Sequence, residues 1–497
     1  MKLRIISALL AVAFICCGCM ARPDESSSVP ALSPNPMPAP KVLEQVNVPW
    51  FPDDSLNPYS CNTLQNYYLG GLLCDPLVAL DGQQKPENRL ALEVTAERNN
   101  YIIQLRHDAV FSDGSTLTAE DVLYSLELAR LTPRFASGLS GVEKAEALDS
   151  GTVVITLKAP DIVFARSLTF PILKKDTAEL SIPVGVGRFL PLTDQNLLVR
   201  NDTYYNPVKN LRQLSLVATD SLEAQSFAIM EGKIDLMYSD LQGDLNLGLG
   251  IGYRQIPLNN MLYLGVNGNK AGGELAVRQA LSGLIDRDEI SRKVYMGFAA
   301  ATSLPINPSA AITSLNASDL EVNRPQQRTL LTQAGYTLSE DGIWKKGAVP
   351  LTFELLVNAE NDERVSAAEL IAHMYKSAGI PVTIVPLPFA EYQGRISKGE
   401  YDLYIGEVRL AYNMDISQLI FSGGSLNPAA PNLPELAALY ADVRSGITES
   451  SLLEKQLRSD LPIIPLLFRR GILCFSRDFS ANIVATEQDI FYNITDW

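Results

Sequence analysis

The chain contains little histidine, tryptophan or cysteine, and this limits the chemistry available to it. Its 497 residues include two histidines, His107 and His373, with three tryptophans and six cysteines. A His-dependent catalytic triad or an imidazole-rich metal site would have to use one of these histidines. The sequence also lacks an H-E-x-x-H motif, a Walker phosphate loop and a nucleophile elbow. We therefore expect a protein that is not an enzyme, with no catalytic residue, no metal ligand and no cofactor.

Long hydrophobic runs are also absent, apart from a short one near the N-terminus. Residues 5–15 are apolar except for Ser7, and they follow Lys2 and Arg4. A bilayer span needs about 20 apolar residues, so this run is too short to cross a membrane but suits a signal-peptide core. It is followed by Gly18-Cys19, which resembles the end of a bacterial lipobox. The resemblance implies a lipoprotein signal peptide over residues 1–18 and a lipid on Cys19.

Two alternatives to lipidation at Cys19 stay open. Cys16 stands where a lipobox usually has an aliphatic residue, so Cys17 is a second attachment site, and an ordinary cleaved signal peptide is the other interpretation. Residues 19–41 are rich in proline and serine and predict a flexible tether. A two-chain lipid gives stable membrane attachment. We expect a protein anchored to the extracytoplasmic face of the bacterial cell membrane.

The charge balance is acidic. The chain has 41 basic and 56 acidic side chains, a net charge of −15, and loss of Lys2 and Arg4 with the signal peptide makes it −17. Such a surface repels nucleic acid, so we expect no nucleic-acid partner. We interpret the net negative charge as a whole as a feature that keeps the protein soluble. The length indicates two or three domains, and we expect a monomer.

Three cysteines remain after the signal region: Cys61, Cys74 and Cys474. They are too few for a disulfide framework. If residues 61–74 form one helix, its ends lie about 20 Å apart, which is beyond disulfide reach. We therefore expect these cysteines to act as small hydrophobic side chains without a disulfide between Cys61 and Cys74.

Apolar spacing predicts strands that alternate with helices. Strands are expected over residues 41–49, 101–105, 153–157, 263–267, 351–357, 382–385, 401–405 and 463–468. Helices are expected over residues 63–73, 277–285 and 365–378, and after an N-cap at Thr118 that is supported by Asp121. Alternating strands and helices indicate α/β lobes with mixed sheets.

A series of ordered motifs covers the chain from about residue 46 to its end. The longest is LRHDAVFSDGSTLTAEDV at residues 105–122. The others are LNP at 56–58, LCDPLV at 73–78, PVGVGRF at 183–189, VRQA at 277–280, IDR at 285–287, AGY at 334–336 and DLPIIPL at 460–466. The series resembles the peptide/nickel class of ABC-importer solute-binding proteins, bacterial family 5. We expect Asp113-Gly114 to form a turn and Gly185 and Gly187 to permit tight backbone turns.

The resemblance implies a two-lobed periplasmic-binding-protein type II (cluster C) fold of the α/β class, with mixed sheets and an extra α+β domain. Lobe I would comprise residues 42–257 and 473–497, including the extra domain over about residues 78–181, and lobe II residues 258–472. The lobes would close by a hinge on a small solute. The protein would then deliver this solute to the permease and ATPase subunits of an ABC importer.

The resemblance also implies a ligand site. In peptide-binding members of the family, the loop after the strand equivalent to residues 401–405 contacts the ligand, and an aspartate binds the peptide amine. The corresponding loop here, residues 406–415, lacks the family's aromatic-rich G-W-x-x-D-x-x-D-P form. It offers five candidate ligand-binding residues: Glu407, Arg409, Tyr412, Asn413 and Asp415. Alternation places Glu407 and Arg409 on one face, where they would bind a zwitterion together or neutralise each other as a surface ion pair.

A peptide is the leading ligand among several. The loop contains no histidine for nickel, and three tryptophans are few for stacking on sugars. Two other functions remain open from the sequence. One is a surface lipoprotein that senses peptides and docks a membrane sensor, and the other is a surface hydrolase, which the scarcity of histidine disfavours.

Overall fold

The computed structural model describes residues 44–242, 251–310, 320–477, 479 and 481–497. All of them belong to one compact unit, Val42–Trp497. The predicted signal peptide, Cys19 and the tether lie outside the described residues. Within the described ranges, no helix combines the length and apolar character needed to cross a membrane.

The first sheet brings the start of the chain beside residues that follow much later. Its strands lie in the order β1 (Gln45–Trp50), β10 (Gln213–Ala218), β9 (Leu197–Arg200) and β8 (Phe189–Leu192). β1 is parallel to β10, and the other neighbours are antiparallel. Val46 and Val48 alternate along β1 and are both buried, which confirms the strand predicted from their spacing.

Short elements surround this sheet. α1 begins after the N-cap Thr63, as predicted, and ends at Gly70, earlier than the spacing indicated. Together with α1 (Leu64–Gly70), the short elements are β2 (Val78–Leu80), β3 (Pro86–Asn88), η1 (Phe164–Ser167), η2 (Thr193–Gln195), α4 (Leu222–Met230), β11 (Leu236–Ser239) and η5 (Ile494–Asp496).

A second four-stranded sheet is entirely antiparallel. Its order is β4 (Ala91–Glu97), β5 (Asn100–Leu105), β7 (Thr152–Leu157) and β6 (Val142–Asp149). α2 (Ala119–Leu131) packs against β6 and β7, and α3 (Pro133–Leu139) packs against α2. These elements confirm the predicted strands at residues 101–105 and 153–157 and the predicted helix after Thr118.

Asp121 fixes the start of α2. Its carboxylate accepts hydrogen bonds from the backbone N–H and the hydroxyl of the N-cap Thr118, at 2.9 and 2.6 Å. Its other oxygen accepts from the backbone N–H of Lys175, at 2.8 Å. The carboxylate therefore satisfies an exposed helix end and also holds a distant segment against it.

One hydrophobic core serves both of these sheets, and the end of the chain completes it. Val46 and Ile103 lie in this core together with Phe491 and Trp497. The guanidinium group of Arg188, 3% exposed, donates to the carbonyl of Phe491 at 2.9 Å and to the carboxylate of Asp489 at 2.8 Å. We name the elements around this core lobe I.

The largest sheet is mixed. Its order is β11, β20 (Ile464–Phe475), β12 (Gly252–Val266), β19 (Leu403–Arg409), β17 (Phe353–Asn358) and β18 (Val382–Leu387), with β13 (Ala299–Ala301) paired to β20. β17 is parallel to β18 and β19, and the other pairs are antiparallel.

Both faces of this sheet are covered. Leu262 and Leu264 of β12 pack into a core with α5, α6 and α8, whereas Met261 and Tyr263 pack into a second core with α9 to α12. Successive side chains of a strand point to opposite faces, so one strand contributes to both cores. We name the elements around these two cores lobe II.

The remaining elements of lobe II are α5 (Leu275–Gly283), α6 (Arg287–Val294), α7 (Arg324–Gln333), α8 (Asp362–Ser377), α9 (Phe389–Ser397), α10 (Ser417–Ile420), α11 (Pro434–Arg444), α12 (Ser450–Asp460), η3 (Ala271–Gly273) and the small sheet of β14 (Thr337–Leu338), β15 (Trp344–Lys346) and β16 (Val349–Pro350). The predicted helices at residues 277–285 and 365–378 correspond to α5 and α8. His373 lies on α8, and its side chain is exposed.

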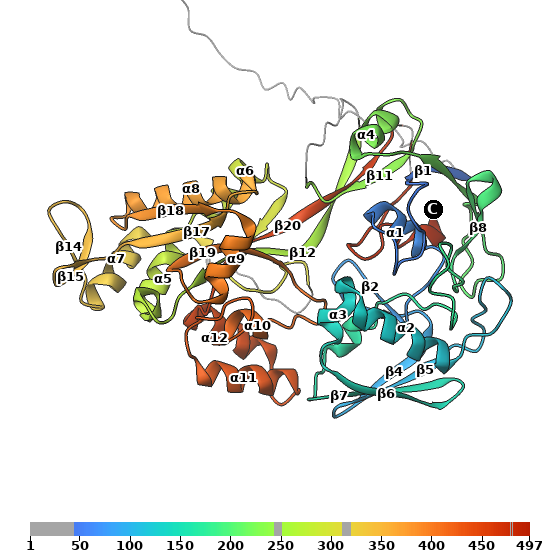
Figure 1. Ribbon diagram of the computed structural model, residues 1–497, viewed down its shortest axis with the longest axis horizontal. Helices are drawn as coiled ribbons and strands as arrows, with labels where there is room; N and C mark the ends of the chain where they lie inside the picture. The colour runs from blue at the N-terminus through green and yellow to red at the C-terminus, as the bar shows by residue number, and fades with distance from the viewer. Residues whose placement is uncertain (1–43, 243–250, 311–319, 478, 480) are drawn as a thin grey trace, which may run out of the picture. The chain divides into compact units, whose positions relative to one another are not determined.

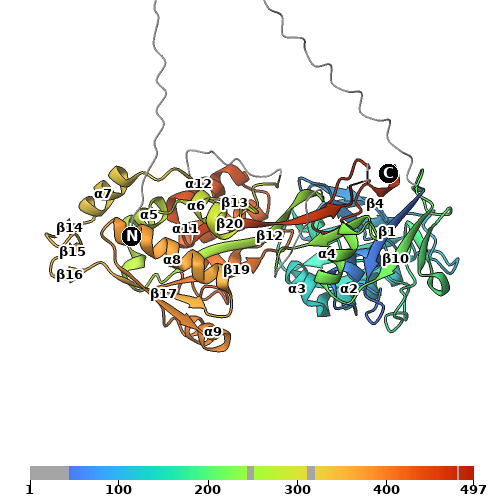
Figure 2. The same ribbon diagram turned by 90° about the horizontal axis from the view of Figure 1, so that it is seen from above.

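The strands β12 and β20 connect the two lobes. Figures 1 and 2 show them side by side over their whole length. Their register breaks where Leu258, Asn259 and Asn260 of β12 lie opposite Arg469 alone on β20. Core residues on the two sides of this bulge belong to different cores, Ile256 to lobe I and Met261 to lobe II. The strand pair β12 and β20 therefore passes from lobe I to lobe II at this bulge.

Three strands extend further than the apolar pattern predicted. The strands predicted at residues 263–267, 463–468 and 401–405 overlap β12, β20 and β19. Each observed strand differs from its prediction by one or two residues at one end and continues at the other through polar residues such as Asn259, Arg469 and Arg409. Pairing with a neighbouring strand holds these polar residues in the sheet. A prediction from hydrophobic alternation misses such strand extensions, because it counts only apolar residues.

Cys61, Cys74 and Cys474 are all unpaired, which confirms the expectation for Cys61 and Cys74. Cys74 and Cys474 are buried, and Cys61 is partly buried. The expected turn at Asp113-Gly114 is confirmed, with φ of +86° at Gly114. Gly185 and Gly187 have a different role from the one predicted. Their φ angles are ordinary, and they are needed because the backbone of Leu72 and Leu73 and the side chain of Cys74 approach them closely.

Replacing Gly187 by alanine should destabilise the fold, because the new Cβ would lie 2.3 Å from the backbone carbonyl carbon of Leu73. We expect the free energy of unfolding in urea to fall by about 1–3 kcal/mol. Gly82→Ala is the matched control, since nothing lies within 4 Å of its Cβ, and it should change stability by no more than about 0.5 kcal/mol. Equal stability of the two variants would contradict the close-approach explanation.

Candidate binding site at the lobe interface

The segment predicted to carry the ligand contacts is partly a strand. Glu407 and Arg409 belong to β19 and pair with Leu262 and Asn260 of β12. The expected loop over residues 406–415 therefore begins only at Leu410. Within β19, the missing side chain of Gly406 leaves room for the ring of Tyr263, which a Cβ would approach to 2.5 Å.

Glu407 is buried and neutralised inside lobe II. Its carboxylate accepts from Arg364 of α8 at 3.1 Å and from Arg469 of β20 at 3.4 Å, and its side chain is 6% exposed. Asn260 is a third donor residue, at 3.2 Å. Arg469 also donates to the carbonyl of Asp240 in lobe I at 3.0 Å. Glu407 thus positions an arginine at the interface.

Arg409 makes its ion pair across the interface. Its Nε donates to the carboxylate of Glu487 in lobe I at 3.0 Å, and its Nη2 donates to the hydroxyl of Tyr412 at 3.2 Å. The attraction of Glu487 raises the pKa of Arg409, so the guanidinium stays charged. The other Glu487 oxygen accepts from the backbone N–H of Asn259 at 3.1 Å. Glu407 and Arg409 therefore do not neutralise each other, because each pairs with another residue. Their joint binding of a zwitterion stays a prediction.

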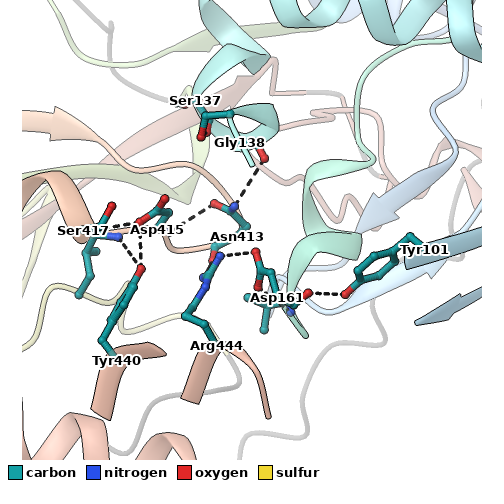
Figure 3. A network of polar contacts seen from close by, with 12 residues as sticks. Tyr101, Ser137, Gly138, Asp161, Asn413, Asp415, Ser417, Tyr440 and Arg444 are labelled. Carbon is teal, nitrogen blue, oxygen red and sulfur yellow. Dashed lines mark hydrogen bonds and ion pairs between the residues drawn. The ribbon is translucent and has the colours of Figure 1, made fainter. Parts of the chain in front are cut away.

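Asn413 and Asp415 belong to a second polar network, shown in Figure 3. Arg444 of α11 donates to the backbone carbonyl of Asn413 and to the carboxylate of Asp161 in lobe I. The Asn413 amide donates to the carbonyl of Gly138 at 3.5 Å. The side chains of Asp161 and Arg444 are 13% and 15% exposed, so this ion pair between the lobes is largely shielded from water.

Asp415 is engaged within lobe II. It accepts from the backbone N–H of Ser417 and from the hydroxyl of Tyr440, both at 2.9 Å. Burial alone would raise the pKa of Asp415, but these hydrogen bonds outweigh it and the pKa is lowered. Burial is the stronger effect at Asp161, whose pKa is raised.

Two cavities at the interface are lined by residues of both lobes. One of about 110 Å³ lies between α3 and the segment Arg409 to Tyr412. The other, a groove of about 490 Å³, follows the Asp161–Arg444 pair and is also lined by Asn413 and Asp415. Of the five predicted residues, two line each cavity and Glu407 lines neither. The structure thus brings four of them to the interface, in two places.

Sequence reasoning missed the residues that lobe I contributes. These are Arg134 and Ser167 beside the smaller cavity, and Asp161 and Glu487 in the ion pairs. Arg444 and Asp161 are separated by 283 residues in the chain, and no local pattern links them. Arg134 follows Pro133 at the start of α3 and was not distinguishable from a solvated surface residue.

The described residues contain no group of three or more His, Cys, Asp or Glu side chains placed to hold a metal ion. Both histidine side chains, His107 and His373, are exposed. The polar residues at the interface are instead arginines, carboxylates, tyrosines and hydroxyl groups, which bind polar groups by hydrogen bonds and charge.

Two lobes that meet over charged side chains and are joined by a pair of strands define the architecture of a hinged binding protein. The sequence profile described as "Bacterial extracellular solute-binding proteins, family 5 Middle" matches residues 85–427. Because the match covers more than half of the chain, this protein belongs to that family of extracytoplasmic solute-binding proteins.

Individual relatives are similar in sequence or fold. The chain is 25% identical over 377 residues to a probable deoxycholate-binding periplasmic protein of Escherichia coli (strain K12), covering 67% of this chain and 69% of that one. It is 23% identical over 426 residues to the periplasmic oligopeptide-binding protein of the same strain, covering 74% and 76%. The crystal structure of a nickel ABC transporter protein from Bacillus halodurans matches with a TM-score of 0.74 at 21% identity, covering 90% and 98%. The structural likeness confirms the two-lobed α/β fold.

The Asp161–Arg444 pair should contribute measurably to stability. Replacing Arg444 by methionine leaves a buried carboxylate without its ion-pair partner, so we expect the free energy of unfolding to fall by about 3 kcal/mol. A double-mutant cycle with Asp161→Asn should show a coupling of at least about 1 kcal/mol.

Arg395→Met is the matched control for this cycle, because Arg395 makes an ion pair with Glu354 at 3.3 Å on the surface of lobe II. Its removal should cost about 0–1 kcal/mol. Additive effects of Arg444→Met and Asp161→Asn would show that the two side chains do not stabilise the interface as a pair.

Proposed function

We propose that this protein captures a small solute, a peptide first among the candidates, between its two lobes and delivers it to an ABC importer. The permease and ATPase subunits of that importer are the proposed partners, and a lipid on Cys19 is the proposed anchor at the extracytoplasmic face of the membrane. We also propose that the protein has no catalytic turnover.

The observation that carries the binding proposal is the Arg409–Glu487 pair between the lobes. It joins a strand end of lobe II to the C-terminal segment of lobe I, beside the side chains of Tyr68 and Tyr412. A ligand with a positive and a negative end would satisfy both charges, because each end would replace one partner of the pair. A peptide with free termini has this chemistry.

The relatives support a range of solutes, since their names include an oligopeptide, deoxycholate and nickel. We place the peptide first because the interface offers charged and tyrosine side chains suited to peptide groups. The proposed contacts are Arg409 and Tyr412 in the smaller cavity, Asn413 and Asp415 in the groove, and Glu407 through its arginine partners.

The proposed boundaries place residues 42–257 and 473–497 in lobe I, with the extra domain over about residues 78–181, and residues 258–472 in lobe II. The bulge at residues 258–260 is the proposed hinge. A break in ladder pairing lowers the cost of bending a strand at that point. A solute that contacts both lobes favours closure by its greater affinity for the closed state.

The alternative function is that of a signalling lipoprotein. Such a protein would bind the same solute and, in its closed state, dock on a membrane sensor. Neighbouring genes for two permeases and two ATPases would favour transport over signalling. Incubation of the protein with peptide, ester and phosphoester panels tests for turnover, and a robust activity that a single substitution abolishes would contradict a pure binding function.

Arg409→Ala should weaken binding of the solute that native mass spectrometry finds on the purified protein. The change leaves Glu487 buried without its cation, so we expect calorimetry to show a loss of about 2–5 kcal/mol. Asp415→Ala tests the groove in the same way. Arg395→Ala removes an arginine from a surface pair and should cost about 0–1 kcal/mol. Losses below about tenfold for both Arg409→Ala and Asp415→Ala, with the fold intact, would contradict this site.

Cys19→Ala should release the protein from membranes, because we propose that the lipid on Cys19 is what attaches it. Fractionation and labelling with a radioactive fatty acid measure the effect, and Cys17→Ala is the matched control that should leave both unchanged. Retention and labelling of the Cys19→Ala protein would contradict lipidation at this residue.

A further inference from the structure

The smaller interface cavity has an unusual charge. Its lining includes two guanidinium groups, Arg134 from α3 of lobe I and Arg409 from β19 of lobe II, and no carboxylate. The polar lining is completed by hydroxyl groups, among them Ser137, Ser167 and Thr169. A cavity with cations and hydroxyl donors but no acid favours a negatively charged occupant.

The two arginines differ in how they are neutralised. Arg409 has a carboxylate partner, Glu487, at 3.0 Å. Arg134 has no carboxylate partner among the described residues, and its guanidinium group lies over the ring of Tyr67, 3.9 Å from the centroid. Stacking orients a guanidinium group and leaves its N–H donors free for an anion. The cavity thus retains one positive charge in excess.

Ser167 gives an independent indication of a missing partner. Its side chain is 7% exposed and lines the cavity, yet its Oγ has no hydrogen-bond partner among the described residues. The preceding residue, Arg166, is 6% exposed, and its Nη1 also lacks a partner in the described part of the chain. Buried polar atoms are nearly always hydrogen-bonded, so a hydroxyl donor without a partner beside a cavity indicates a ligand atom.

We propose that this cavity is a carboxylate subsite, in which Arg134, Ser167 and Arg409 together bind a carboxylate group of the captured solute. The inference rests on the proposed solute-binding function and adds the chemical class of the group recognised. A guanidinium fork matches the two oxygens of a carboxylate, and a serine hydroxyl supplies a further donor.

The subsite also couples binding to closure. Arg134 belongs to lobe I and Arg409 to lobe II, so closing the lobes brings two positive charges to one cavity. Glu487 neutralises only Arg409, so closure encloses the Arg134 guanidinium without a counter-ion, and this opposes closure unless an anion enters the cavity. A carboxylate on the solute supplies that counter-ion and binds to both lobes at once, and it therefore stabilises the closed state more than the open one.

The carboxylate has two sources, the C-terminus of a peptide and a non-peptide acid, and one experiment separates them. The full-length protein in detergent is titrated with a tripeptide mixture that has free carboxylates, with the same mixture amidated at the C-terminus, and with butyrate and benzoate. Calorimetry and thermal unfolding are the measurements. Arg134→Gln and Ser167→Ala are the test variants. Arg130→Gln is the matched control, because Arg130 lies on α2 in an exposed pair with Glu127.

We expect carboxylate forms to bind about tenfold to a hundredfold more tightly than amides, the range for a hydrogen bond to a charged group. Arg134→Gln should abolish this preference, Ser167→Ala should reduce it, and Arg130→Gln should leave it unchanged. Binding of butyrate or benzoate with the same dependence on Arg134, without tripeptide binding, would support the subsite and contradict the peptide proposal.

Three results would overturn the subsite. The first is equal affinity for the free and amidated tripeptides, and the second is a preference that survives in both Arg134→Gln and Ser167→Ala. The third is no stabilisation by any of these carboxylates at millimolar concentration. Native mass spectrometry of the purified protein tests solute binding separately, so a solute without an acidic group would refute the subsite and leave the binding function standing.

Discussion

The structure depends on one long antiparallel pair, β12 and β20, which belongs to both lobes. The pair has two irregularities, a bulge at residues 258–260 where it passes between the lobes and a register shift between Leu262 and Tyr263 within lobe II. Asn259, fully buried in the bulge, contacts both lobes. It donates its N–H to Glu487 and accepts a side-chain bond from Gln84, both in lobe I, and its carbonyl accepts from Leu410 in lobe II. The strands fix the position of the interface, and the bulge concentrates bending at one point.

The two ion pairs across the interface are suited to a contact that must open. Their carboxylates are largely shielded from water, and the cost of removing charged groups from water offsets much of their attraction. A large apolar interface would be harder to separate. Charged pairs give the closed arrangement its specific geometry without a large net free energy, so a small solute can change the balance between open and closed states.

The sequence predicted the type of most elements, and its main errors had a common cause. β12, β19 and β20 all extend through polar residues that hydrophobic alternation excludes, because neighbouring strands pair with them. The family resemblance indicated residues 406–415 as a ligand-contacting segment, and four of its five candidate residues line cavities between the lobes. It could not indicate Arg134, Ser167, Asp161 or Glu487, since their proximity to this segment arises only from tertiary packing. The glycines 185 and 187 illustrate the same limit, because the close approach of residues 72–74 leaves no local signal.

The contribution of the C-terminus to the core of lobe I has a consequence for the order of folding. Val46 near the start of the chain and Trp497 at its end are buried in the same core, and Arg188 binds the segment that carries Phe491. Contacts of such long sequence separation form late, because a large loop must close before they can be made. Lobe I therefore cannot complete its core until the last residues of the chain are available. A chain that crosses a membrane from its N-terminus would remain incompletely folded during passage, as a narrow translocation channel requires, and would acquire its final stability only after release on the far side.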